Sequence, residues 1–169
     1  GVPYLTIKKD FQSDATIKIE KLLYTGPLLQ PNSLKIEIDN KQIVLLPAKT
    51  LRYNNVWGLD FQVKAMDVRE IAAEKIRAMS ERARYRDYYD FLLLVDAFQP
   101  DLTEVISYVS QKEIRTEISK ENILRNWMLI GSQKSKEMDQ TYYAIDLDDA
   151  RVLEAINLLP FDRILPPGK

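Results

Sequence analysis

The N-terminal third of the chain alternates between apolar and polar residues with a period of two, which is typical of β-strands. Clusters of Gly, Pro, Asn and Ser separate the short alternating runs, as tight turns require. The pattern predicts five strands, at residues 4–8, 16–23, 34–39, 43–46 and 60–65.

The rest of the chain has helical periodicity and predicts five helices, at residues 68–84, 87–98, 102–112, 121–130 and 148–159. Because a run of strands precedes a run of helices, the order indicates an α+β fold rather than a parallel α/β fold. We expect a small, mostly antiparallel sheet packed on a C-terminal helical bundle. The expected domains are a β-rich one at 1–66 and a helical one at 67–169, packed together as one unit.

A lysine stands at the border of the apolar stripe of the first predicted helix. The stripe runs through Val68, Ala72, Ile76 and Met79, and Lys75 lies at its edge. The stem of such a lysine is partly buried, so the ammonium group either binds a phosphate as a point charge or simply reaches solvent. The pattern leaves both interpretations open.

The second predicted helix aims a carboxylate, Asp87, at its apolar face. Burying a carboxylate is costly unless it is paired, hydrogen-bonded or bound to a cation. Asp87 could cap the helix together with Asp90, as the helix dipole favours. It could instead pair with Lys75, Arg84 or Arg86, or point into an active cleft.

Basic residues are concentrated around the junction of these two helices. Residues 69–86 contain six basic side chains and three acidic ones. The segment 82–86, with Tyr85 between its arginines, could bind phosphate and stack on a base. A charge run of this kind is also typical of a solvated surface.

The predicted strand 34–39 carries acids on one face. Glu37 and Asp39 alternate with Ile36 and Ile38, so the two carboxylates share a face. They could supply a metal ligand or a base. Any half-exposed antiparallel strand has the same pattern.

Composition narrows the possible chemistry. The 169 residues include no cysteine and no histidine, which excludes thiol nucleophiles, histidine bases and the usual zinc sites. Carboxylates, Lys, Arg and Tyr remain, a set that suits magnesium. The net charge is −1, so any attraction to phosphate must be local. No apolar run reaches the roughly 20 residues of a membrane span, and no signal peptide is visible, so we expect a cytoplasmic protein without membrane contact.

Two segments together resemble the signature of the AbiEii/AbiGii toxin nucleotidyltransferases: VREIAAEKIRAM at 68–79 and RYRDYYDFLLL at 84–94. That family has an Ala-Glu-Lys helix, a short loop with arginine, and Arg-Asp-x-x-Asp opening a second helix. The resemblance implies a DNA-polymerase-β-like toxin that transfers NMP from NTP, with Mg²⁺, to an RNA acceptor. In related toxins the target is tRNA. It further implies an antitoxin partner and no DNA substrate.

The resemblance also implies roles for individual residues. Lys75 matches the lysine that contacts the nucleotide, and Asp87 matches the carboxylate of the last motif. By their place beside Asp87, the substrate-binding candidates are Arg86, Arg84 and Asp90. The metal-ligand candidates, on a looser match, are Asp39 and Glu37.

One family feature has no counterpart in residues 1–66, namely a Gly-Gly or Gly-Ser turn followed by an Asp-x-Asp pair. We therefore expect this chain to be a C-terminal fragment, inactive alone and without a tightly bound cofactor. A formal match, Gly131-Ser132 followed by Asp146-x-Asp148, has an almost wholly polar intervening segment, and Asp148 better fits a helix cap. The alternative function is a non-catalytic helical module that binds a protein partner or RNA.

Overall fold

The computed structural model describes residues 5–12, 16–25, 30–39, 42–112, 114–131 and 147–166. The chain divides into two compact units, Gly1–Ile43 and Val44–Lys169, and each is treated by itself. Strands come first and helices follow, so the predicted α+β class is confirmed. Within the described ranges, no helix is both long enough and apolar enough to cross a membrane.

The N-terminal unit contains a three-stranded antiparallel sheet with the order β1-β2-β3. The strands are β1 (Leu5–Gln12), β2 (Thr16–Thr25) and β3 (Pro31–Asp39), so the three strands predicted here exist and are longer than expected. The pairing of β2 with β3 shifts register between Ile19 and Leu22.

The predicted strand at 43–46 is wrong. The backbone amides of Leu45 and Leu46 donate to the two carboxylate oxygens of Glu70, at 2.7 and 3.0 Å, rather than to a neighbouring strand. The strand lies a few residues later, as β4 (Lys49–Asn54), and it pairs with the predicted strand β5 (Asp60–Ala65) in an antiparallel hairpin.

The tip of this hairpin is organised by one asparagine and one glycine. The side-chain oxygen of Asn55 accepts hydrogen bonds from the amides of Trp57 and Leu59, at 3.0 and 3.1 Å. Gly58 has a φ of +79°, which a residue with a side chain adopts only at a cost. These contacts close the turn between the two strands.

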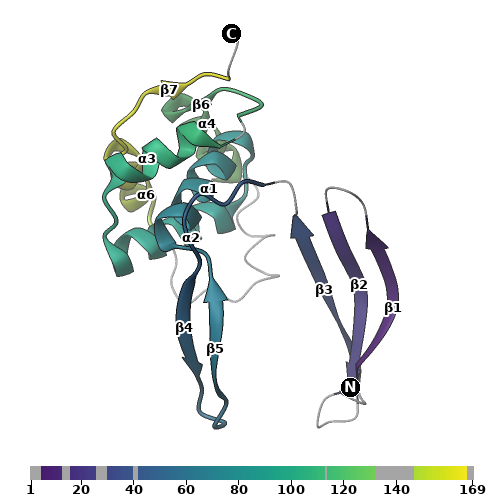
Figure 1. Ribbon diagram of the computed structural model, residues 1–169. Helices are drawn as coiled ribbons and strands as arrows, with labels where there is room; N and C mark the ends of the chain where they lie inside the picture. The colour runs from purple at the N-terminus through teal and green to yellow at the C-terminus, as the bar shows by residue number, and fades with distance from the viewer. Residues whose placement is uncertain are drawn as a thin grey trace. The chain divides into compact units, whose positions relative to one another are not determined.

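All five predicted helices are present, and no end differs from the prediction by more than three residues. They are α1 (Val68–Glu81), α2 (Tyr85–Phe98), α3 (Leu102–Gln111), α4 (Lys120–Gly131) and α6 (Asp149–Asn157). Two short strands, β6 (Ile118–Ser119) and β7 (Arg163–Ile164), pair with each other and were not predicted. Figure 1 shows the helices gathered in one body, with β4 and β5 extending from it.

Helix α1 is central to this body because it contacts α2, α3 and α4. Its residues Ala72, Ile76 and Met79 are fully buried, as the apolar stripe predicts. Aromatic rings fill the space beside it: the ring of Trp127 lies 5.0 Å from that of Tyr88, centroid to centroid. Trp127 is thus a core residue.

Aspartates cap several of the helices. Asp67 caps α1, Asp101 caps α3 and Asp148 caps α6, each accepting a hydrogen bond from a backbone amide of the first turn. The cap predicted at Asp148 is confirmed. Ser132 and Asp146 of the formal motif match lie outside the described residues.

Candidate functional site

The short connection between α1 and α2 brings the predicted lysine and aspartates together. The Lys75 ammonium on α1 lies 3.3 Å from Oδ1 of Asp87 and 2.5 Å from Oδ2 of Asp90. Asp87 and Asp90 are one helical turn apart on α2, so both can face α1. The side chain of Lys75 keeps 22% of its surface exposed, which agrees with its predicted place at the border of the apolar stripe.

Asp87 is the buried centre of this cluster, with 1% of its side chain exposed. Its carboxylate also accepts two hydrogen bonds from the Arg82 guanidinium, from Nε at 2.9 Å and from Nη2 at 3.3 Å. Burial raises the pKa of Asp87, but the Arg82 hydrogen bond and the charges of Arg82 and Lys75 outweigh it and hold the pKa below its usual value. The carboxylate is therefore charged at neutral pH.

Among the interpretations of Asp87, pairing with Lys75 is confirmed. Its second partner, Arg82, was not among the predicted ones; sequence reasoning placed this arginine only in a loop that could bind phosphate. The N-cap residue of α2 is Arg84, and Asp87 lies in the first helical turn instead. Asp87 is thus not the cap, although the helix dipole favours an acid at this place.

Arg84 and Arg86 are exposed, and neither has an ion-pair partner among the residues that the structure describes. Asp90 is also partly in water, with 44% of its side chain exposed. The start of α2 therefore carries two solvated guanidinium groups, which are close to Asp87 in the sequence. Such an arrangement suits an anion with several charges.

A groove of about 420 Å³ lies beside the cluster. Lys75 and Asp90 supply its polar lining, and the rest of its lining is apolar: Ile71, Leu93, Leu94, Ala97 and Phe98. Its size falls within the range of small-molecule sites, which are mostly apolar with a few placed polar groups.

The other two candidate residues, Glu37 and Asp39, belong to β3 of the N-terminal unit. Glu37 lies 3.0 Å from the Lys35 ammonium, and Asp39 accepts a hydrogen bond from the amide of Gln42 at 3.3 Å. Their role as metal ligands stays a prediction. Within the described parts of the chain, no three acidic side chains gather in a group that could hold a metal ion.

Sequence reasoning missed a buried ionic network on another face of α1. Glu70 accepts a hydrogen bond from the Lys112 ammonium at 2.7 Å, and both side chains are almost completely buried. Lys112 also lies 2.8 Å from Glu74, which in turn pairs with Arg77 at 2.9 Å. Together with the amides of Leu45 and Leu46, these contacts fix the start of the second unit to the helix that carries Lys75.

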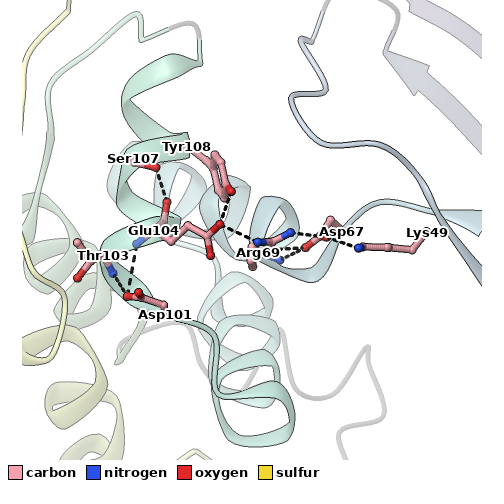
Figure 2. Close-up of polar contacts among 8 residues, drawn as sticks. All are labelled: Lys49, Asp67, Arg69, Asp101, Thr103, Glu104, Ser107 and Tyr108. Atoms are coloured by element: carbon pink, nitrogen blue, oxygen red, sulfur yellow. Dashed lines mark hydrogen bonds and ion pairs between the residues drawn. The ribbon is translucent and has the colours of Figure 1, made fainter.

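A further network fixes the base of the β4–β5 hairpin (Figure 2). Lys49 of β4 lies 3.5 Å from Asp67, whose carboxylate also binds Arg69 at 2.9 Å. Arg69 extends to Glu104 of α3 at 2.7 Å. The hydrogen bond from Arg69 holds the pKa of Asp67 well below its usual range, despite burial. The hairpin is thereby attached to both α1 and α3.

Comparison with known proteins gives one match. The family model described as "Nucleotidyl transferase AbiEii toxin, Type IV TA system" matches residues 6–157, a range that includes all the candidate residues. No curated protein and no solved structure matches the chain.

Proposed function

Because the chain belongs to the AbiEii family of nucleotidyltransferase toxins of type IV toxin–antitoxin systems, we propose that it takes part in NMP transfer from NTP to a tRNA-like RNA acceptor. The observation that supports this proposal is the cluster of Lys75 with Asp87 and Asp90 between α1 and α2. The family also implies an antitoxin partner.

Lys75 is proposed to bind the phosphates of the nucleotide. An ammonium group has three N–H donors. Two of them serve Asp87 and Asp90, so a phosphate arriving from the exposed side could take the third donor together with the one that Asp90 now holds. Asp87, shared between Lys75 and Arg82, acts as a positioning residue that holds both cations in place.

The neighbouring features fit the remainder of the substrate. Arg84 and Arg86 present exposed cations for the triphosphate or for the RNA backbone. The groove offers apolar surface for the base, with Lys75 and Asp90 in its lining. Asp90, which is half-exposed, is the carboxylate that an incoming phosphate would replace on Lys75.

The family typically uses Mg²⁺. However, Asp87 and Asp90 both bind the Lys75 ammonium, and Asp87 also binds the Arg82 guanidinium. These two carboxylates do not fit a magnesium ion in this arrangement. Glu37 and Asp39 remain the proposed ligands from this chain, and the roles proposed for Lys75, Arg82 and Asp87 do not require them to bind the ion.

The test is transfer of labelled nucleotide from each NTP to a tRNA pool, with magnesium, by the full-length protein. Lys75→Ala and Asp87→Ala should each abolish transfer while the helical content stays unchanged. Lys120→Ala removes another half-buried lysine and is the matched control. Full activity of the Lys75→Ala/Asp87→Ala double variant would refute the assignment.

A second assay separates this proposal from a non-catalytic module. A nucleotidyltransferase should show a magnesium-dependent thermal shift with NTP, and Lys75→Ala should remove the shift. In a module without catalysis, Asp87→Asn would change stability only, and NTP would give no shift.

A further inference from the structure

The β4–β5 hairpin exposes an apolar face. Its register pairs Leu51 with Val63 and Tyr53 with Phe61, so these four side chains lie on one face. All four are exposed, and Trp57 at the tip has 83% of its surface in water. Among the described elements, β4 and β5 pair extensively only with each other (Figure 1).

An exposed apolar face on a hairpin of this kind indicates a binding surface. A two-stranded hairpin is marginally stable in water, and here its apolar side is not covered by a helix. Contiguous exposed apolar surface of this kind marks a place where another molecule binds. The chemistry of the hairpin indicates which class of molecule that is.

Three aromatic rings dominate the exposed surface. The rings of Tyr53 and Phe61 lie 5.0 Å apart, centroid to centroid, at an angle of 38°, and Trp57 belongs to the turn that joins the two strands. Exposed aromatic side chains on a β-ribbon or sheet are a common platform for unpaired bases, because every base has a face that can stack.

The charge of the hairpin suits a phosphate backbone. Residues 49–65 contain three basic side chains and one acidic one, in a chain whose net charge is −1. The single acid, Asp60, accepts two hydrogen bonds from the Arg52 guanidinium, so these two charges neutralise each other. Of the other two cations, Lys49 lies on the apolar face and pairs with Asp67, and Lys64 adds positive charge on the opposite face.

The hairpin leads directly into the helix that carries the candidate site. Strand β5 ends two residues before the Asp67 cap of α1, and Lys75 lies seven residues after Val68. At 1.5 Å per residue this is about 10 Å along the helix. The network of Lys49, Asp67 and Arg69 fixes the hairpin base to that helix (Figure 2).

We propose that the apolar face of the β4–β5 hairpin binds unpaired bases of the RNA acceptor by stacking on Tyr53, Trp57 and Phe61. The proposal rests on the proposed function for the identity of the acceptor. It adds a binding surface separate from Lys75, Asp87 and the arginines, and it gives that surface a ligand class, single-stranded RNA.

The test is fluorescence anisotropy of a labelled single-stranded RNA with the full chain, without NTP or magnesium. Trp57→Ala and Phe61→Ala should each weaken binding about tenfold, since stacking on one ring contributes about that factor or more. Trp57→Phe should retain most of the affinity, because it keeps an aromatic face. Met128→Ala is the control, since Met128 is an apolar side chain on α4 that is 72% exposed.

Unchanged RNA affinity in the alanine variants would overturn the proposal. If those variants instead alter the sedimentation coefficient while RNA affinity stays the same, the face is a protein interface and the proposal also fails. Because RNA binding is measured without nucleotide, this outcome is independent of the Lys75→Ala transfer assay. If the protein transfers nucleotide normally and the hairpin variants bind RNA as the wild type does, only the proposal of RNA binding by the hairpin is refuted.

Discussion

Replacing Glu70 with alanine tests whether the buried ionic network stabilises the second unit. Glu70 is fully buried and binds the Lys112 ammonium and the amides of Leu45 and Leu46. Glu70→Ala leaves two amides without their acceptor and a buried ammonium with Glu74 as its remaining carboxylate partner among the described residues. The loss comes from the contacts of the Glu70 side chain itself and does not require any rearrangement of α1.

The magnitude follows from these contacts. Removing one member of a buried ion pair costs about 3–5 kcal/mol, because the other charge stays buried. The contact of Lys112 with Glu74 at 2.8 Å offsets part of this cost. We therefore expect the free energy of unfolding to fall by about 3 kcal/mol, and Tm by roughly 10 °C for a unit of this size.

The assay is urea unfolding at pH 7, followed by circular dichroism and by the fluorescence of the buried Trp127. Glu81→Ala is the matched control on the same helix: Glu81 lies 3.9 Å from Arg77 and is partly exposed, so its loss should cost under about 0.5 kcal/mol. A Glu70→Met/Lys112→Met double variant should recover part of the loss. Equal stability of Glu70→Ala and the control would refute the reasoning.

Three further perturbations test separate contacts. Tyr88→Phe removes a buried hydroxyl that donates to the Ile123 carbonyl at 2.7 Å, and urea unfolding should show a loss of about 1 kcal/mol. Asn126→Ala removes an amide that donates two hydrogen bonds to carbonyls at the end of α1, and should cost about 2 kcal/mol in the same assay. Burial raises the pKa of Asp87, but Arg82 and Lys75 lower it by more, so the folded-state pKa lies below the usual value. The ion pairs of Asp87 therefore stabilise the fold above about pH 4, and this stabilisation is lost as the pH falls through the folded-state pKa. Unfolding free energies measured from pH 7 to pH 3 should therefore fall more steeply for the wild type than for Asp87→Asn.

The helices and the Lys75 cluster were predictable because their signals are local. The stripe of Ala72, Ile76 and Met79 has the period of a helix and is fully buried. Asp87 is aimed at an apolar face, so a cation partner was one of the expected solutions, and Lys75 is that partner. Which arginine joins them depends on the path of the connection, which the sequence pattern does not specify.

The features that the sequence did not predict depend on distant contacts. Leu45 and Leu46 have the composition of a strand, but their amides bond to a side chain 25 and 24 residues away. Glu70, Arg77 and Ser80 form a second buried stripe of α1. Charged residues at helical spacing look like a solvated face in a sequence, because nothing local indicates that Lys112 will bind Glu70 and Glu74.

The two carboxylates on Lys75 differ in how readily they can exchange. Asp87 is inaccessible to water and is also bound by Arg82, so it stays in place, whereas the partly hydrated Asp90 makes a contact worth about 0–1 kcal/mol. A singly charged anion would gain little by displacing Asp90, whereas a triphosphate would bring several charges to the same ammonium. If Lys75 binds the nucleotide as proposed, the cluster would therefore discriminate between anions by their charge, and common salts at cellular concentration would leave Lys75 available.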